Sequence, residues 1–371
     1  MEREDNSDPI PIDILLEILS RSSTKSIARF GLASKFCASL LRGPDFTELF
    51  LTRPSTRPRL LFAVGNSDEW RFYSSPQNPD EDHSLEVVSA DFHMQLPKDM
   101  VGKEIFGPVS GLLYFPNMGT DTVPVICNPM TGLLKRLTQI TSKYNPTSLL
   151  GYDLIGKQYK VLSIIYSPYG SEEHVSTLGT RDVSWRKVRC HVNHDPPIKE
   201  GICINGVLYY IVDVYRNKLL KIGCFDVRSE KLRFLHKDST TMSLSSCLSP
   251  IKLINYKGKL GVISWSWNCY RDVIKFCLWI LEDDQKQEWL KREYTLPVYT
   301  GVKNNAYVVA GVTATGEIIV SMNKKFKPFL VYYFNPERNT LKKVRIPGLE
   351  ASEDYSRVQA FVDYAEDLKC I

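Results

Sequence analysis

The chain has 371 residues, of which 43% are hydrophobic and 11% aromatic, and its formal net charge is +5. This composition excludes a disordered chain, and the length suits one small domain followed by a larger one. The mild positive charge includes no run of lysine or arginine, so nucleic acid is not an expected partner. The most apolar run, Val273 to Leu281, contains Lys275 and is far too short to span a bilayer, so no membrane partner is expected.

The first eight residues are acidic, with Glu2, Glu4, Asp5 and Asp8, which is the opposite of the basic start of a signal peptide. We expect residues 1–8 to form a disordered acidic N-terminus. The nine cysteines stand singly and their number is odd, which predicts reduced, mostly buried thiols rather than a disulfide framework. Together these features predict an intracellular protein, located in the nucleus, the cytoplasm or both.

Residues 9–53 show the apolar spacing of short amphipathic helices, with Pro11 placed at a first helical turn. One apolar stripe is formed by Ile14, Leu15, Ile18 and Leu19. A unit this small buries little surface by itself, so a leftover stripe indicates a docking face for a partner. A helical cap that packs on the rest of its own chain explains the same pattern equally well.

One set of residues in this segment follows a known pattern: Pro11, Asp13, Glu17, Ile18, Leu19, Arg21, Lys25, Ser26, Arg29, Phe30, Ser34, Lys35, Ser39, Leu40, Pro44 and Phe46. By these residues the segment resembles an F-box, the motif that binds the Skp-type adaptor of cullin-RING ubiquitin ligases. The chain departs from the family pattern at Ser22-Ser23, which replaces the usual Leu-Pro, at Phe36, which replaces the usual Trp, and at Gly31 within the second helix. We expect the adaptor to contact Pro11, Ile14, Leu15, Ile18, Leu19, Ile27, Leu32 and Lys35.

Past a linker at residues 54–58 the helical spacing disappears, and short apolar runs alternate with turn residues, as in strands and hairpins. One unit recurs: a Gly-led apolar hairpin, a strand, an Asx-type turn and a further strand that ends in a charged, amphipathic pattern. Five copies begin at Gly107, Gly151, Gly201, Tyr256 and Thr315. Their Asx-type turns lie at Asn128, Asp182, Asp226, Asp283 and Asn335.

A period of about fifty residues with four short strands per unit is typical of a kelch-like β-propeller blade. A sixth blade is expected where Val358 to Tyr364 pairs with Arg59 to Val64 or Trp70 to Ser75, which closes the ring and removes an exposed edge. A β-sandwich or a less regular stack of hairpins is the alternative. The predicted fold is therefore a multi-domain α+β chain, with a three-helix unit before a mostly antiparallel all-β domain of about six blades at residues 59–371.

Several segments of this larger region follow a known pattern: Pro44 to Leu49 running into Arg57 to Phe62, Ala90 to His93, Cys127 to Pro129, Gly201 to Tyr210, Leu253 to Gly261 and Phe334 to Leu341. By these segments the chain is similar to the plant F-box proteins that carry an F-box-associated domain of type 3. This resemblance implies that the N-terminal unit binds an adaptor and that the C-terminal domain recruits substrates for ubiquitination.

Other candidate sites carry weaker signals. Four soft metal ligands could come from Cys190, His191, His194 and Cys203, but the spacing matches no standard zinc pattern, so no metal is expected. A recognition pocket could be lined by Trp265, Trp267, Tyr270 and Tyr299, although an alternating Trp-x-Trp is more often part of a core.

The acidic clusters Glu282-Asp283-Asp284 and Glu172-Glu173 are expected to lie in solvated loops, and no catalytic motif or cofactor site is recognised. We therefore expect a non-catalytic substrate-recognition subunit of a Skp–cullin–F-box ubiquitin ligase, with no cofactor. Its partners would be the adaptor, a cullin reached through it, and a target protein, whose binding residues the sequence does not assign. The alternative is a ligand-binding or enzymatic propeller with a degenerate F-box, which the departures at Ser22-Ser23 and Gly31 keep open.

Overall fold

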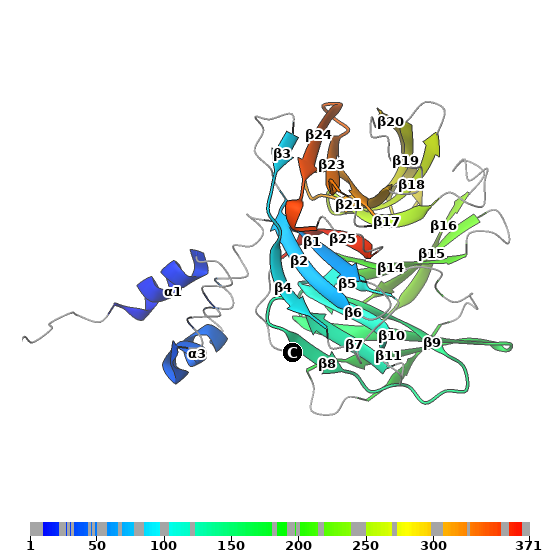
Figure 1. Cartoon of the computed structure of the whole chain (residues 1–371). Helices are drawn as coiled ribbons and strands as arrows, with labels where there is room; N and C mark the ends of the chain where they lie inside the picture. Colours follow the sequence, from blue (N-terminus) through cyan, green and yellow to red (C-terminus); the bar gives the residue numbers. More distant parts are fainter. Residues whose placement is uncertain are drawn as a thin grey trace, which may run out of the picture.

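The structure is a computed structural model, in which a ring of β-sheets lies beside a small helical segment (Figure 1). It describes residues 10–21, 27, 30, 33–43, 46, 49, 58–65, 69–77, 85–96, 104–118, 123–179, 184–190, 197, 201–213, 219–238, 250–268, 273–297, 307–324, 327–349 and 356–365. Within these residues the strands form six sheets, each of which is one blade of a β-propeller.

In each blade one strand lies at the centre of the ring and the others follow outwards, and the strands of a blade are named in that order. Blade 1 contains β25 (Arg357–Tyr364), β1 (Arg59–Gly65), β2 (Trp70–Pro76) and β4 (Asp91–Gln95). Blade 2 contains β5 (Phe106–Val109), β6 (Leu112–Met118), β7 (Val123–Asn128) and β8 (Leu133–Arg136). Blade 3 contains β9 (Pro146–Asp153), β10 (Gln158–Ser167), β11 (Gly170–Thr177) and β12 (Arg186–Val188).

The remaining blades follow the same plan. Blade 4 contains β13 (Ile202–Ile204), β14 (Val207–Asp213), β15 (Leu219–Asp226) and β16 (Leu232–Asp238). Blade 5 contains β17 (Ile251–Tyr256), β18 (Lys259–Asn268), β19 (Val273–Asp283) and β20 (Glu288–Pro297). Blade 6 contains β21 (Tyr307–Val312), β22 (Ile318–Met322), β23 (Leu330–Asn335), β24 (Thr340–Arg345) and the parallel β3 (Leu85–Val87), and the 3-10 helix η3 (Pro347–Leu349) follows β24.

The ring is closed by the last strand of the propeller. β25 pairs antiparallel with β1, so that Val358 lies opposite Val64 and Ala360 lies opposite Phe62. The innermost strands contact one another in the order β25, β5, β9, β13, β17, β21, and β21 contacts β25 again. The predicted pairing of the two ends and the six-bladed ring are confirmed, and the β-sandwich alternative is wrong. The kelch-like character of the blades stays a prediction.

Successive residues of a strand point to opposite faces of its blade, and each face packs against a neighbouring blade. Leu112 belongs to the core between blades 2 and 3, whereas Leu113 belongs to the core between blades 1 and 2. Leu149 and Leu150 are divided in the same way between the two neighbours of blade 3. This double burial explains why many strands read as wholly apolar runs rather than as alternating ones.

The Asx-type turns lie between the third and fourth strands of their blades. Asn128 Oδ1 accepts hydrogen bonds from the backbone N–H groups of Met130 and Thr131, at 3.0 and 3.4 Å. Four residues on, Gly132 has a φ of 72°, the left-handed conformation that glycine adopts without strain. Asp226, Asp283 and Asn335 cap their turns in the same way, which confirms these predicted turns. Asp182 lies outside the described residues.

Ion pairs join neighbouring blades at these turns. Glu230, on the turn between β15 and β16 of blade 4, accepts a hydrogen bond of 2.7 Å from Lys160 Nζ and one of 2.9 Å from Arg186 Nε, both in blade 3. Burial alone would raise the pKa of Glu230, but the hydrogen bonds from Arg186 and Lys160 hold it below its ordinary value. Blade 4 is therefore tied to blade 3 by a carboxylate that is ionised at neutral pH.

The N-terminal segment has two helices with described bounds, α1 (Ile12–Arg21) and α3 (Lys35–Arg42), rather than the three that were predicted (Figure 1). Residues 22–26, 28–29 and 31–32, which include most of the predicted second helix, lie outside the described part of the chain. Ser34 caps α3, because its Oγ accepts a hydrogen bond of 3.1 Å from Cys37 N. Among the described helices, none is long and apolar enough to cross a membrane.

Candidate partner-binding sites

One side of α1 faces the interior of the helical segment. Leu19 is buried together with Ile27 and Phe46, and the three form a small core. Leu15 and Leu16 pack against this core from the same helix. The segment therefore has an apolar interior of its own. Leu15 and Leu19, two of the four residues in the predicted docking stripe, belong to this interior.

The other side of α1 is apolar and exposed. Ile14 and Ile18 lie four residues apart, which places them on the same side of the helix, and each is 50% exposed. Phe36, in the first turn of α3, is 56% exposed. Three large apolar side chains at the surface of so short a segment are a feature of binding faces. We call the side of α1 that carries Ile14 and Ile18 the exposed apolar face, and Phe36 is a further exposed apolar side chain on α3.

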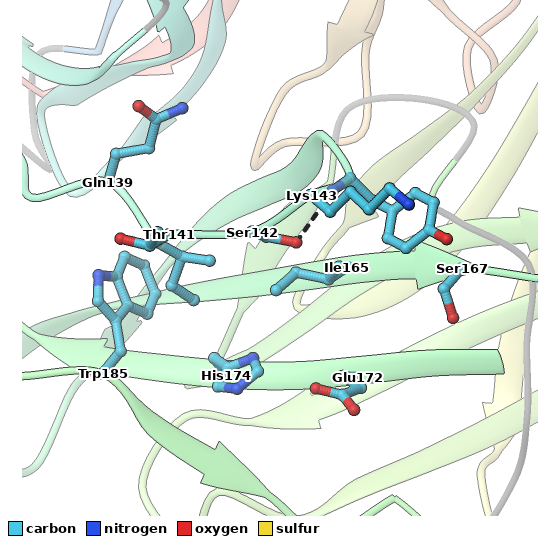
Figure 2. A pocket seen from close by; sticks show the side chains of 11 residues that line it. Gln139, Thr141, Ser142, Lys143, Ile165, Ser167, Glu172, His174 and Trp185 are labelled. Carbon is cyan, nitrogen blue, oxygen red and sulfur yellow. Dashed lines mark hydrogen bonds between the residues drawn. The ribbon is translucent and has the colours of Figure 1, made fainter. Parts of the chain in front are cut away.

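A groove lies on blade 3, and its lining is shown in Figure 2. Its volume is about 560 Å³, within the range of roughly 300–1,000 Å³ that is usual for ligand sites. We call it the blade 3 groove. One wall is the segment between β8 and β9, and the floor and the other wall come from β10, β11 and Trp185. The lining residues are Gln139, Ile140, Thr141, Ser142, Lys143, Tyr144, Ile165, Ser167, Glu172, His174 and Trp185.

Some polar groups of this groove are engaged in an ion pair or a hydrogen bond. Glu172 forms an ion pair with Lys187, with 3.2 Å between Oε1 and Nζ. Trp185 Nε1 donates a hydrogen bond of 3.0 Å to the carbonyl oxygen of Thr138. Burial lowers the pKa of His174, Glu172 opposes this effect and Lys187 adds to it. His174 is therefore neutral at pH 7.

A smaller cavity of about 210 Å³ lies among the innermost strands, lined by residues of β5, β13, β17, β21 and β25. Lys252 lines it, and its Nζ donates a hydrogen bond of 2.9 Å to the carbonyl oxygen of Ala310. Asp363, at the same cavity, accepts a hydrogen bond of 2.6 Å from Gln77 Nε2. Burial raises the pKa of Asp363. These two charged residues are thus used in joining β17 to β21 and β2 to β25.

Ser74 and His93 form a serine–histidine contact, with 2.6 Å between Oγ and Nε2. Arg59 Nε donates to the same Ser74 oxygen at 2.7 Å, and Arg59 also pairs with Asp91. Burial and the nearby Arg59 lower the pKa of His93 to about 4, against a smaller opposite effect of Asp91. Ser74 has no exposed surface, so no substrate can reach its hydroxyl group. The cluster holds β1, β2 and β4 together.

Comparison with known proteins assigns the two parts of the chain. Residues 9–49 match the F-box domain, and residues 59–365 match the F-box associated beta propeller domain. The chain belongs to the F-box protein family. A relative from Arabidopsis thaliana that is named for its F-box is 60% identical over 384 residues, which cover both chains completely. Another F-box protein of this plant is 44% identical, over 98% of this chain and 91% of the relative.

Comparison with solved structures gives only low similarity. The β-propeller domain of the Trilobed protease from Pyrococcus furiosus is 14% identical, with a TM-score of 0.37 over 67% of this chain and 71% of that one.

The structure divides the residues at which this F-box protein was predicted to contact the adaptor. Pro11, Ile14, Ile18 and Lys35 are exposed, Leu15 is half-buried, and Leu19 and Ile27 are buried in the helical core. Leu32 lies outside the described residues. Sequence reasoning left Phe36 out of the set, although its place in the F-box pattern, where the family usually has Trp, marked it as a large side chain at a conspicuous position.

Other predicted sites in the propeller are placed as follows. Trp265 and Trp267 are half-buried against the core, and Trp267 stacks on Tyr307 with 6.0 Å between ring centroids, which favours the core interpretation. Tyr270 and Tyr299 lie outside the described residues. The expectation that Glu172 and Glu173 lie in a solvated loop is wrong. Both are on β11, and Glu173 is buried because it faces the neighbouring blade.

The possible metal ligands are only partly described. Cys203 is half-buried, its Sγ lies 3.4 Å from the backbone N of Tyr152, and burial raises the pKa of its thiol. Cys190 is half-buried, and His191 and His194 lie outside the described residues. Within the described part of the chain, no three residues of metal-binding type come together.

Proposed function

We propose that this F-box protein is a non-catalytic substrate receptor of a Skp–cullin–F-box ubiquitin ligase inside the cell. The exposed apolar face of α1 binds the Skp-type adaptor, which connects the receptor to a cullin, and the propeller binds the target protein. The receptor then acts by proximity, since it raises the local concentration of a target lysine near the conjugating enzyme. We also propose that the segment completes the three-helix arrangement of an F-box.

The observation that carries this proposal is the division of α1 into two sides. A helix that only capped its own chain would leave little apolar surface exposed, yet Ile14 and Ile18 are each half exposed while Leu19 is buried. The helical segment therefore has an interior of its own and still presents a second apolar side. Burying that side against a partner would contribute roughly 25 cal/mol for each Å² of apolar surface removed from water.

The test is a titration of a purified Skp-type adaptor against the full chain and against Ile18→Asp. Placing a carboxylate at the contact buries a charge without a partner, so binding should weaken at least a hundredfold, with about 1.4 kcal/mol for each factor of ten. Ile155→Asp is the matched control, because Ile155 is 71% exposed on the turn between β9 and β10. It should bind like the wild type.

Leu15 and Leu19 are unsuitable positions for this test, because both contribute to the helical core and a charge there would unfold the segment. If the wild type does not bind the adaptor, the receptor function itself is refuted. If Ile18→Asp and the wild type bind equally well, the adaptor uses another face.

A further inference from the structure

The blade 3 groove has an apolar end that is fixed in place. The indole of Trp185 is held by its hydrogen bond to Thr138, and it packs against the core between blades 2 and 3. Ile165 lies in the floor, at the position on β10 opposite Glu172. A side chain that is already fixed loses little entropy on binding, and tryptophan is enriched among the residues that dominate binding energies. This end is therefore suited to an apolar side chain.

The other end of the groove is positively charged. Figure 2 shows Lys143 on the side of Ser167, away from Trp185. The carboxylate of Glu172 is paired with Lys187, whereas Lys143 has no ion-pair partner among the residues that the structure describes. Lys143, Lys187 and Glu172 together carry one positive charge in excess. An acidic group of a ligand would therefore complement this end of the groove.

The length of the groove suits an extended chain. Ser167 lies opposite Gly170, and Trp185 directly precedes Arg186, which lies opposite Val175. Gly170 and Val175 are separated by five steps along β11, which amounts to about 17 Å at roughly 3.4 Å per residue. An extended peptide of about five residues covers the same distance.

We propose that the blade 3 groove binds an extended acidic segment of the target protein, with an apolar side chain against Trp185 and a carboxylate at Lys143 about four residues away. This inference rests on the proposed receptor function and gives it a substrate class. The polar residues along the wall, Ser142 and Thr141 among them, leave the sequence between the two anchors variable.

The test uses a phage-displayed library of random twelve-residue peptides, selected against the immobilised full chain. The enriched peptides should share an aspartate or glutamate about four positions from a large apolar residue. The best peptide, made synthetically with a fluorophore, should bind Lys143→Glu at least tenfold more weakly than the wild type. Selection against Lys143→Glu should instead enrich lysine or arginine at the acidic position.

Lys157→Glu is the matched control, because Lys157 is an exposed lysine of the same blade at the opposite end of β10. It should bind the peptide within twofold of the wild type. The proposal is overturned if no peptide is enriched, as a groove for a small molecule would give, if the enriched peptides lack an acidic residue, or if both lysine variants bind equally.

Adaptor titration of the same preparations separates this inference from the one on which it rests. Adaptor binding without any peptide binding refutes the groove and leaves the receptor function standing. Peptide binding without adaptor binding refutes the receptor function, and with it the identification of the peptide as part of a ubiquitination target.

Discussion

Arg233 of blade 4 and Asp284 of blade 5 form a two-pronged ion pair, with 2.6 Å between Nη1 and Oδ1. Asp284 directly follows Asp283, the residue that caps the turn between β19 and β20. The next junction repeats the arrangement, because Lys257 of blade 5 pairs with Glu337 on the turn between β23 and β24. An acidic residue of an Asx-type turn thus holds the preceding blade at successive junctions of the ring.

These junctions should differ in strength. Lys160 is only 8% exposed, so Glu230→Gln leaves a buried ammonium without its charged partner and should lower the free energy of unfolding by about 2 kcal/mol or more. Arg233 and Asp284 are each 46% exposed, so Asp284→Asn should cost only about 0.2–1 kcal/mol. Urea unfolding of the two variants beside the wild type measures both. Equal losses would contradict this account of the junctions.

Stability should fall as the pH is lowered from about 6.5 to about 4, in part because of His93. Its pKa is about 4 in the folded protein and near 6.5 in an unfolded chain, so the unfolded state binds more protons in this window. The loss of folding stability that His93 causes amounts to about 3 kcal/mol well below pH 4, and it is absent well above pH 6.5. The measurement is the difference between the wild type and His93→Gln across this range. A difference that does not change with pH would refute the assignment.

Gly223 is required by the ring that lies across from it. Tyr210 is its partner on the neighbouring strand and is fully buried, and a Cβ at position 223 would lie only 2.3 Å from the ring carbon Cζ. We expect Gly223→Ala to cost about 2–3 kcal/mol in thermal or urea unfolding, because the ring cannot move aside. The double variant Gly223→Ala with Tyr210→Leu should recover part of the loss. The double variant should lose less unfolding free energy than the sum of the losses in Gly223→Ala and Tyr210→Leu. If its loss equals that sum, the clash is not the cause.

The closing strand should be indispensable. A chain that ends at Ser356 lacks β25, which leaves an open edge on β1. It also lacks the strand that contacts both β21 of blade 6 and β5 of blade 2. It should be recovered as aggregate rather than as a soluble monomer, as judged by size-exclusion chromatography. A soluble monomer with unchanged melting behaviour would argue against closure by β25.

The repeat and its turns could be predicted because turn chemistry is local. Asn128 and Asp283 cap the backbone within three residues of themselves, so a short stretch of sequence specifies the turn. The same locality misled the assignment of Glu172 and Glu173. Two adjacent carboxylates suggest solvent, but on a strand they point to opposite faces, and the one at 173 is buried by the adjacent blade.

The sites required long-range information. The spacing of apolar residues showed a stripe on α1, but only contacts with Ile27 and Phe46 decide which half of it is interior. The blade 3 groove was not predicted, because its walls come from segments between residues 139 and 185 that strand pairing brings together. Trp185 and Lys143 are 42 positions apart in the sequence, and nothing near either residue indicates that both line one groove.

The pairing of β25 with β1 also fixes when the ring can form during protein synthesis. The ribosome must have made residue 364 before the blade begun at residue 59 has its innermost strand. Until then every nascent propeller exposes an unpaired edge of β1, however well the blades between have folded. Closure therefore cannot precede the synthesis of β25, whichever of the other blades has folded first.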